Sequence, residues 1–426
     1  MKITYFVNTM FLMTGKNTKV LCDPWVTSGN KSRSGLYNFP KLKTTREELP
    51  NLKPDFIYIS HTHADHFDPD TLCVFDKNIP ILVSWYKHNF TEKAVRGIGF
   101  KDVRVSDPNK PLKLNGEDTC WIEPSAKYSA VDSIAVFNID GFNILNANDC
   151  GFNYDQCKSI KQRFLDIHAA CIPSGMQGPY PAFYQNLTLE EKKEESEKKK
   201  YNNFMSIIDY IKVLKPKYLI ALTGGAVYGG KKALLMPYTG VGTAVEAKKF
   251  LQKKNIEIET ILLSEKCSFD FNKKETEGVF VDNSHENSKE YFKEISCIQS
   301  PFEEGGNFWV SESEQIDLST LLYNARVKQL LWQQRLNIVS SSVFFIDVGQ
   351  EYIYRLSLSD ETVQKAKEID IKDVEYEIFR MPYSLLIAFL TRHYNYSNLK
   401  TQFVDFYRKP DIFNPDLHLL MSHLHL

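Results

Sequence analysis

The stretch "SHTHADH", Ser60–His66, places three histidines and an aspartate directly after the apolar run "FIYI". Histidines at alternate positions of an extended chain point to the same side, because side chains alternate along a strand. Neutral imidazoles bind borderline divalent ions, and a carboxylate adds charge for a harder ion. The stretch therefore predicts two adjacent metal positions, one held by His61 and His63 and the other by Asp65 and His66.

A divalent ion in this loop would lower the pKa of a bound water toward about 7 and supply a nucleophile at neutral pH. Asp65, inside the cluster, is our candidate catalytic residue. The alternative is a polar loop that carries histidines by chance. We disfavour it because His-x-His-x-Asp-His directly after a buried strand is a specific pattern.

The composition excludes several other classes of protein. With 426 residues, the chain is long enough for two or three domains. The 52 basic and 53 acidic residues nearly balance, so we expect no broad basic surface for nucleic acid or an anionic membrane. No apolar run approaches the roughly 18 residues of a membrane span. The N-terminal "MKITYFVNTMFLMTG" is interrupted by polar residues and predicts two short strands rather than a signal peptide.

The eight cysteines are scattered, without Cys-x-x-Cys or Cys-x-His pairs. Zinc fingers, Rieske clusters and ferredoxin-type clusters are therefore disfavoured. We expect buried thiols in a reducing cytoplasm. Cys150, which follows Asp149, is expected to be a small buried residue.

Short apolar runs alternate with turns and helical stretches over residues 1–280. The predicted strands include "TKVLCDPW", "PDFIYIS", "PILVSW", "DSIAVFNI", "FNILNAND" and "PKYLIAL". Two of these share a pattern: "GKNTKVLCDP" and "DGFNILNAND" each join a turn, a strand and a terminal acid, Asp23 or Asp149. Two halves that each end in an acid predict a two-layered sheet with a site along its edge.

The later parts of the chain are more polar or more mixed. The charged run "EEKKEESEKKK", Glu190–Lys200, predicts a solvated helix face, with a lid over the site as the alternative. Residues 281–315 look like a linker, and 316–426 like a smaller α+β accessory domain. Within that domain, the alternation in "LHLLMSHLHL" favours a terminal strand, in which His423 and His425 are structural.

The histidine cluster also carries a family resemblance. "SHTHADH", preceded by "KVLCDPW" and followed by "ILNANDC", resembles the signature of the metallo-β-lactamase superfamily. The resemblance implies an α/β fold, an αββα sandwich over residues 1–280. It implies metal ligation by His61, His63, Asp65, His66 and Asp149, with Asp23 as a support behind the ligands.

A narrower resemblance covers more of the chain. "LCDPWVTSG", "DFIYISHTHADH", "FNILNANDC", "SGMQGPYPAFY" and "KPKYLIALTGGAVYGG" follow the order of the metallo-β-lactamase-like part of CMP-N-acetylneuraminate hydroxylases. Ligands for the Rieske domain of those enzymes are missing from this sequence. Hydroxylation of the same kind would therefore need electrons from another protein.

Two departures from the superfamily pattern concern metal ligands. The histidine usually found between His66 and Asp149 is absent, and its place falls on Tyr128. The usual late histidine is absent too, and "TGGAVYGG" stands at that strand end. We expect either one weakly held metal position or completion by substrate, water, Glu123, Asp132 or Tyr128.

The glycine-rich "GGAVYGGKK" nearly matches a P-loop, but Lys232 stands where the motif requires Ser or Thr. Its backbone amides and a lysine could still hold a substrate phosphate. Gly225, Tyr228 and Lys231 are therefore candidate substrate-binding residues. A simple glycine turn on the floor of the pocket is equally compatible with the sequence.

We favour a metal-dependent hydrolase acting on a phosphorylated or sugar-nucleotide-like small molecule, because the sequence shows no electron-carrying module. A non-haem iron oxygenase acting on a sugar nucleotide, with a separate electron-transfer partner, is the first alternative. The second is a metal-bearing binding scaffold that has lost catalysis. The ligand set suits zinc, iron or manganese, in one or two positions.

Overall fold

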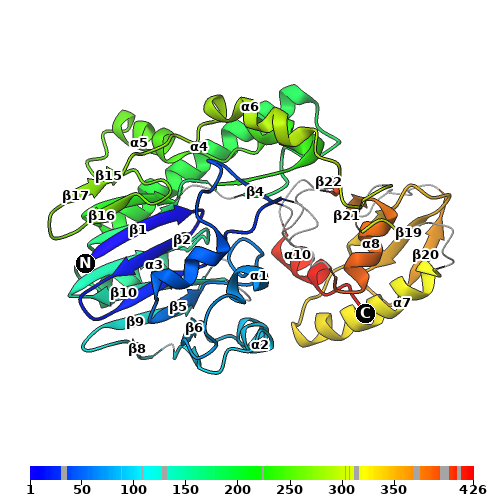
Figure 1. Cartoon of the computed structure of the whole chain (residues 1–426). Coiled ribbons are helices and arrows are strands. Elements are labelled where there is room, and N and C mark those ends of the chain that lie inside the picture. The colour runs from blue at the N-terminus through cyan, green and yellow to red at the C-terminus, as the bar shows by residue number, and fades with distance from the viewer. Residues whose placement is uncertain are drawn as a thin grey trace.

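The computed structural model describes residues 1–29, 36–87, 89–107, 109–126, 132–175, 177–222, 225–302, 304–306, 308–310, 316–367, 375–393, 403–409 and 414–426. Two large sheets lie face to face in the N-terminal part, and a smaller domain packs beside them (Figure 1). The predicted αββα sandwich is confirmed.

The first sheet combines an N-terminal hairpin with parallel strands. All four residues of β5 are buried, as expected for a strand covered on both faces. In spatial order the strands are β17 (Glu275–Glu277), β16 (Ser268–Asp270), β1 (Lys2–Val7), β2 (Met10–Thr14), β3 (Lys19–Cys22), β5 (Phe56–Ile59), β6 (Ile81–Val83) and β7 (Val103–Val105).

β3 and β5 run parallel, with Cys22 opposite Tyr58. Parallel strands end at the same edge of a sheet. Asp23 and Ser60 therefore leave the sheet side by side, and the histidine loop begins beside the first acid.

The second sheet supplies the other acid, since Asp149 follows the end of β11. β10 and β11 form an antiparallel pair in which Ala135 faces Asn146. The strand order is β15 (Glu259–Ile261), β13 (Tyr218–Leu222), β12 (Ala169–Pro173), β11 (Phe142–Asn146), β10 (Ser133–Ile139), β9 (Thr119–Pro124) and β8 (Leu112–Lys113).

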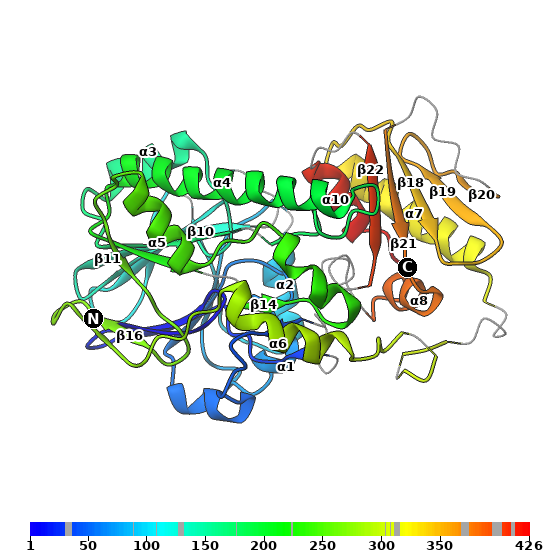
Figure 2. The same ribbon diagram turned by 90° about the horizontal axis from the view of Figure 1, so that it is seen from above.

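Apolar side chains fill three layers. Phe11 and Tyr58 of the first sheet meet Phe137 of the second in the inner core. The outer face of the second sheet packs on α3 (Tyr154–Arg163), α4 (Leu189–Leu214) and α5 (Ala244–Lys253), which lie over it in Figure 2. The outer face of the first sheet meets η2 (Arg46–Leu52), α1 (Pro69–Leu72) and α2 (Phe90–Gly97).

The predicted charged run lies within α4. The helix begins at a capping box formed by Thr188 and Glu191 and ends before Pro216, where Lys215 is left-handed. Not all of the run faces solvent: the Nζ atom of Lys199 donates to the carbonyl oxygens of Tyr180 and Thr239, at 2.9 and 2.8 Å. The charged segment is therefore partly a packing surface.

In its described residues, the C-terminal part forms a five-stranded sheet and three helices. The strand order is β20 (Val363–Ala366), β19 (Ile353–Ser357), β18 (Val343–Asp347), β21 (Tyr376–Arg380) and β22 (Asp405–Lys409). The helices are α7 (Leu318–Arg335), α8 (Tyr383–Leu390) and α10 (Pro415–Ser422).

The terminal strand predicted from "LHLLMSHLHL" is wrong, because α10 occupies this segment. Asn414 caps the helix by accepting from the backbone amides of Asp416 and Leu417, and Pro415 occupies the first turn. The Asn414 cap and the proline favour the start of a helix. They outweigh the alternation of apolar and polar residues from which the strand was predicted.

One continuous core joins the two parts of the chain. It contains Ile59 and Val95 from the sandwich together with Phe344 and Leu420 from the C-terminal domain. The segment predicted as a linker contains α6 (His285–Ser296), which packs on η3 (Gly230–Tyr238). β4 (Tyr37–Asn38) and β14 (Ala226–Val227) pair to form a separate two-stranded ribbon. No helix in the described ranges combines the length and apolar character needed to cross a bilayer.

Candidate metal centre

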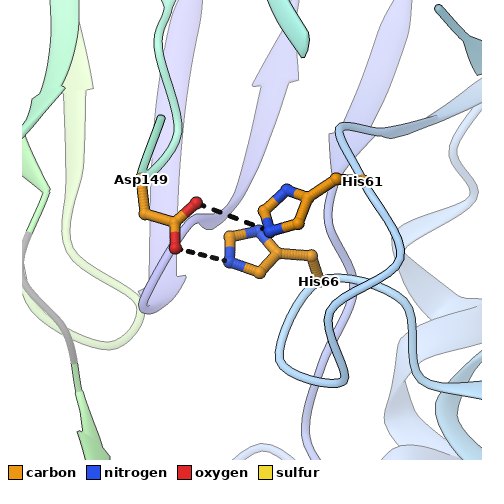
Figure 3. A group of neighbouring side chains, drawn as sticks. All are labelled: His61, His66 and Asp149. Atoms are coloured by element: carbon orange, nitrogen blue, oxygen red, sulfur yellow. Dashed lines mark ion pairs between the residues drawn. The ribbon is translucent and has the colours of Figure 1, made fainter. Parts of the chain in front are cut away.

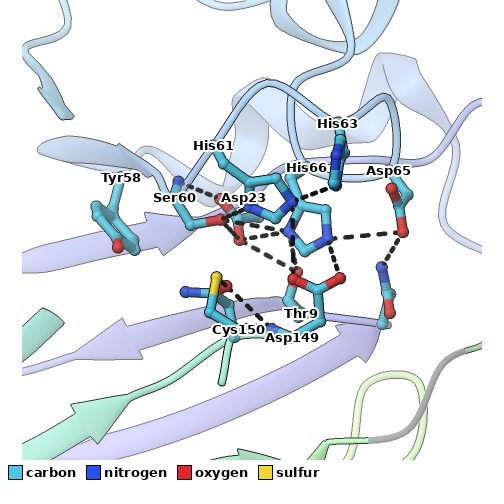
Figure 4. Close-up of polar contacts among 12 residues, drawn as sticks. Thr9, Asp23, Tyr58, Ser60, His61, His63, Asp65, His66, Asp149 and Cys150 are labelled. Atoms are coloured by element: carbon cyan, nitrogen blue, oxygen red, sulfur yellow. Dashed lines mark hydrogen bonds and ion pairs between the residues drawn. The ribbon is translucent and has the colours of Figure 1, made fainter. Parts of the chain in front are cut away.

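Asp23 anchors the histidine loop to the sheet. It is fully buried. Its Oδ1 atom accepts from the backbone amide of Ser60 at 2.8 Å, and its Oδ2 atom accepts from the Ser60 hydroxyl at 2.7 Å. Thr9, in the turn between β1 and β2, donates to the same Oδ2 atom at 3.1 Å. The carboxylate thus ties three strand ends together beneath the site (Figure 4).

His66 is oriented by this carboxylate. Its Nδ1 atom lies 2.9 Å from the Oδ2 atom of Asp23. A proton on Nδ1 satisfies this contact, and Nε2 faces carboxylate oxygens of Asp149 and Asp65 at 3.3 and 3.6 Å. Burial alone would lower the pKa of His66, but the neighbouring carboxylates hold it well above its usual value. Nε2 is buried and has no hydrogen-bond partner among the described residues. A buried nitrogen of this kind is costly unless a cation or proton occupies it.

His61 is held in the same tautomer. Its Nδ1 atom lies 2.9 Å from the hydroxyl oxygen of Ser60, and its Nε2 atom lies 2.8 Å from the Nδ1 atom of His63. Burial, followed by the neighbouring His66, lowers the pKa of His61 well below its usual value. The ring is therefore neutral at pH 7, which is the form that binds metals.

Asp149 faces the two buried imidazoles from one side, with one carboxylate oxygen toward each, as Figure 3 shows. Its Oδ1 atom is 3.7 Å from Nε2 of His61, and its Oδ2 atom is 3.3 Å from Nε2 of His66. Burial alone would raise the pKa of Asp149, but His66 and His61 hold it well below its usual range. The carboxylate thus directs one oxygen toward each imidazole.

Asp65 completes the far side of the cluster. Its Oδ2 atom lies 3.6 Å from Nε2 of His66 and accepts from the side-chain amide of Asn8 at 2.9 Å. The side chain of His66 is 0% exposed, whereas those of Asp65 and Asp149 are 17% and 30% exposed. The cluster is thus closed to solvent at His66 and partly exposed at its two carboxylates.

The donor set fits divalent metal ions. Ligand atoms of His61, His66 and Asp149 all lie within 4.8 Å of one another. Imidazole and carboxylate donors with an orphaned buried nitrogen suit zinc, iron or manganese. The structure groups His61 with His66 and Asp149, while His63 contacts His61 and Asp65 contacts His66. The predicted division into two metal positions stays a prediction.

The other three candidate ligands, Glu123, Asp132 and Tyr128, differ in where they lie relative to the cluster. Glu123 points away: its oxygens accept from Gln156 at 2.8 Å and from Arg163 at 3.3 Å. Asp132 is buried and lies with His61 and Cys150 in a second group whose ligand atoms are within 4.8 Å of one another. Tyr128 lies outside the described residues.

The three candidate substrate-binding residues of the glycine-rich segment have different surroundings. Gly225 approaches β1 so closely that a Cβ atom would lie 2.8 Å from Cγ2 of Val7. Tyr228 is buried, its hydroxyl has no partner among the described residues, and burial followed by the Asp65 carboxylate raises its pKa. Lys231 is exposed.

The neighbouring Lys232 turns to the C-terminal domain. Its Nζ atom donates to the carbonyl oxygen of Val404 and lies 3.3 Å from the carboxylate of Asp405. Lys232 therefore makes a contact with the C-terminal domain, whereas the candidate substrate-binding residue Lys231 is exposed.

Sequence reasoning missed the residues that hold the ligands. Asn8, Thr9, Ser60 and Asn148 carry no metal-binding chemistry of their own. Asn8, Asp23 and Asn148 share one feature. Each is a short polar residue near a strand end, and their backbone φ angles are positive, at 51°, 41° and 42° respectively. Strained backbone of this kind clusters at functional sites.

Comparison with known proteins places this geometry in a family. Residues 2–150 match the family model of the beta-lactamase superfamily domain. This part of the chain is a metallo-β-lactamase-superfamily domain. A UPF0173 metal-dependent hydrolase of Pyrobaculum neutrophilum is 24% identical to this chain over 178 residues, which are 41% of the chain and 72% of that protein.

Two further proteins resemble the metallo-β-lactamase domain. The cytidine monophosphate-N-acetylneuraminic acid hydroxylase of Asterias rubens is 23% identical over 153 residues. That match covers 35% of this chain and 23% of the hydroxylase. The crystal structure of an isothiocyanate hydrolase from Delia radicum gut bacteria superposes with a TM-score of 0.45 and 18% identity, over 64% of this chain and 99% of that one.

Proposed function

We propose that the chain is a metal-dependent hydrolase whose centre is formed by His61, His63, Asp65, His66 and Asp149. The observation that carries this proposal is the buried Nε2 atom of His66, which makes no hydrogen bond among the described residues and faces carboxylate oxygens of Asp149 and Asp65 at 3.3 and 3.6 Å. A site built only for stability would satisfy that nitrogen with a hydrogen bond.

Each side chain has a role that follows from its position. His61 and His63 would hold one ion and Asp65 and His66 a second, with Asp149 as a further ligand. When bound, divalent metal supplies a Lewis acid and lowers the pKa of a water molecule toward about 7. Asp65 lies at the open side of the cluster and is fixed by Asn8. We assign Asp65 to orient that water and accept its proton.

The proposed substrate is a small phosphorylated or sugar-nucleotide-like molecule that enters at the exposed edge of Asp65 and Asp149. A buried floor and a polar mouth suit attack on an ester or phosphoester whose leaving group remains in solvent. Tyr228 offers a hydroxyl beside Asp65 for orienting the substrate.

The test is a substrate screen run with and without oxygen. Purified protein, loaded separately with zinc, iron and manganese, is given CMP-sialic acid, other sugar nucleotides and phosphodiesters in air and under argon. A hydrolase turns over equally in both. Turnover that requires oxygen and a reductant would contradict the proposal.

A second candidate function is an iron-dependent oxygenase acting on a sugar nucleotide. It is favoured by the resemblance to the hydroxylase of Asterias rubens and by the carboxylate-rich donor set, since Asp65, Asp149 and Asp132 gather near two buried imidazoles. This reaction would draw electrons from a separate protein. Oxygen uptake coupled to substrate consumption would distinguish it from the hydrolase.

A further inference from the structure

His61 belongs to two groups of metal-ligating side chains. In the first it lies with His66 and Asp149, and in the second with Asp132 and Cys150. All three members of the second group are buried. We propose that Cys150, together with Asp132, completes the metal position at His61, where the family's usual third imidazole is absent. This inference rests on the metal centre proposed above and names two of its ligands.

The local structure explains how Asp132 reaches the site. Asp132 directly precedes β10, and the next residue, Ser133, donates from its hydroxyl to the carbonyl oxygen of Ser60 at 2.6 Å. The same hydroxyl lies 2.9 Å from the phenol of Tyr58. The start of β10 in the second sheet is therefore hydrogen-bonded to Ser60, the residue that precedes His61.

Cys150 is positioned by the turn that follows β11. The side-chain amide of Asn148 donates to the carbonyl oxygen of Ser133 at 2.7 Å. The Oδ1 atom of Asn148 accepts from the backbone amide of Asp149 at 3.0 Å and lies 2.8 Å from the Sγ atom of Cys150. One side chain thus sets the relation between β10, Asp149 and the thiol.

The chemistry balances without a redox step. Coordination replaces the S–H bond of Cys150 by a sulfur–metal bond, and the proton leaves to solvent. Separations below 4.8 Å between the ligand atoms leave room for one ion, given metal–ligand bonds of about 2.0–2.3 Å. A thiolate is a softer donor than imidazole and favours zinc or iron over manganese at this position.

Cobalt substitution tests the inference without a substrate. The full-length protein is stripped of metal and titrated with Co²⁺ while its absorption spectrum is recorded. A coordinated thiolate adds an intense near-ultraviolet charge-transfer band to the weaker visible bands of bound cobalt. Cys150→Ser should abolish the ultraviolet band, and Asp132→Asn should retain it while cobalt binds at least 10-fold more weakly.

Cys157→Ser is the matched control, because Cys157 is buried in the same apolar core on α3 and should leave the band intact. X-ray absorption of the unmutated zinc-loaded protein gives an independent reading, since a sulfur scatterer should appear at about 2.3 Å. Bound cobalt with no charge-transfer band and no sulfur scatterer would overturn the inference and leave the proposed centre standing. A chain that binds no cobalt would remove both.

Discussion

The Nδ1 atom of His66 lies 2.9 Å from the Oδ2 atom of Asp23, and both side chains are fully buried. This contact turns the opposite nitrogen of the ring toward Asp149. Asp23, at the end of β3, thus sets the orientation of the His66 ring. Asp23 itself is buried and does not lie on the exposed side of the cluster.

Replacement of Asp23 by Asn should weaken metal binding by about 10–100-fold, because the amide cannot hold the imidazole proton as the carboxylate does. Competition with a chromogenic chelator measures the change. Asp55→Asn is the control, because Asp55 accepts only from the exposed backbone amide of Lys19 at 2.7 Å. Equal metal affinity in parent and Asp23→Asn would show that Asp23 does not orient the ligand.

Asn8 allows a test of how Asp65 is positioned. Asn8→Gly removes the side chain that donates to Asp65 but keeps the positive φ of 51° easily accessible. We expect near-parental stability and roughly 10-fold lower kcat/KM. Asn255→Gly, at a φ of 54° in an exposed turn, is the control. Unchanged turnover in Asn8→Gly would mean that Asp65 needs no such support.

The proximity of the candidate ligands was predictable, because most of them are neighbours in the sequence. His61, His63, Asp65 and His66 form one contiguous motif, and Asp149 follows an apolar strand with the same pattern as the strand before Asp23. Parallel pairing of β3 with β5 then brings an acid and the histidine loop to one edge.

Contacts between distant segments were not predictable in the same way. The hydrogen bonds from Asn8 to Asp65 and from Ser133 to Ser60 depend on the register of the two sheets. Glu123 looked available in the sequence, yet the strand face on which it lies turns it to Arg163. At the C-terminus, capping by Asn414 outweighed an alternating pattern that favoured a strand.

Gly225 should tolerate no side chain. A Cβ atom there would lie 2.8 Å from Val7, so Gly225→Ala forces β1 or the glycine segment to move. We expect a loss of about 1–3 kcal/mol in the free energy of unfolding. Gly97→Ala, where no atom lies within 4 Å of the added carbon, is the control in urea unfolding. Equal stabilities would show that Gly225 is not a packing residue.

Lys199 should give the stability a specific pH dependence. Burial lowers its pKa from 10.5 to about 8. Between these pH values the unfolded chain holds a proton that the folded chain has released, so this group's contribution to stability rises with pH. The unfolding free energy of the parent minus that of Lys199→Met should therefore increase across this window.

Lys193→Met, on the exposed side of α4, should show no such rise. A constant difference between the parent and Lys199→Met from pH 8 to 10.5 would contradict the burial of the ammonium group.

The central claim is that the His61–His66 loop and Asp149 hold divalent metal. Its most direct test is the metal content per chain of the double variant His61→Ala/His63→Ala, purified without chelator beside the parent. Loss of two imidazoles leaves one position with too few ligands, so we predict at least one ion fewer per chain. His168→Gln is the control, since His168 accepts from the backbone amide of Asn143 at 3.0 Å, remote from the cluster. Metal content equal to the parent's in the double variant would contradict the account.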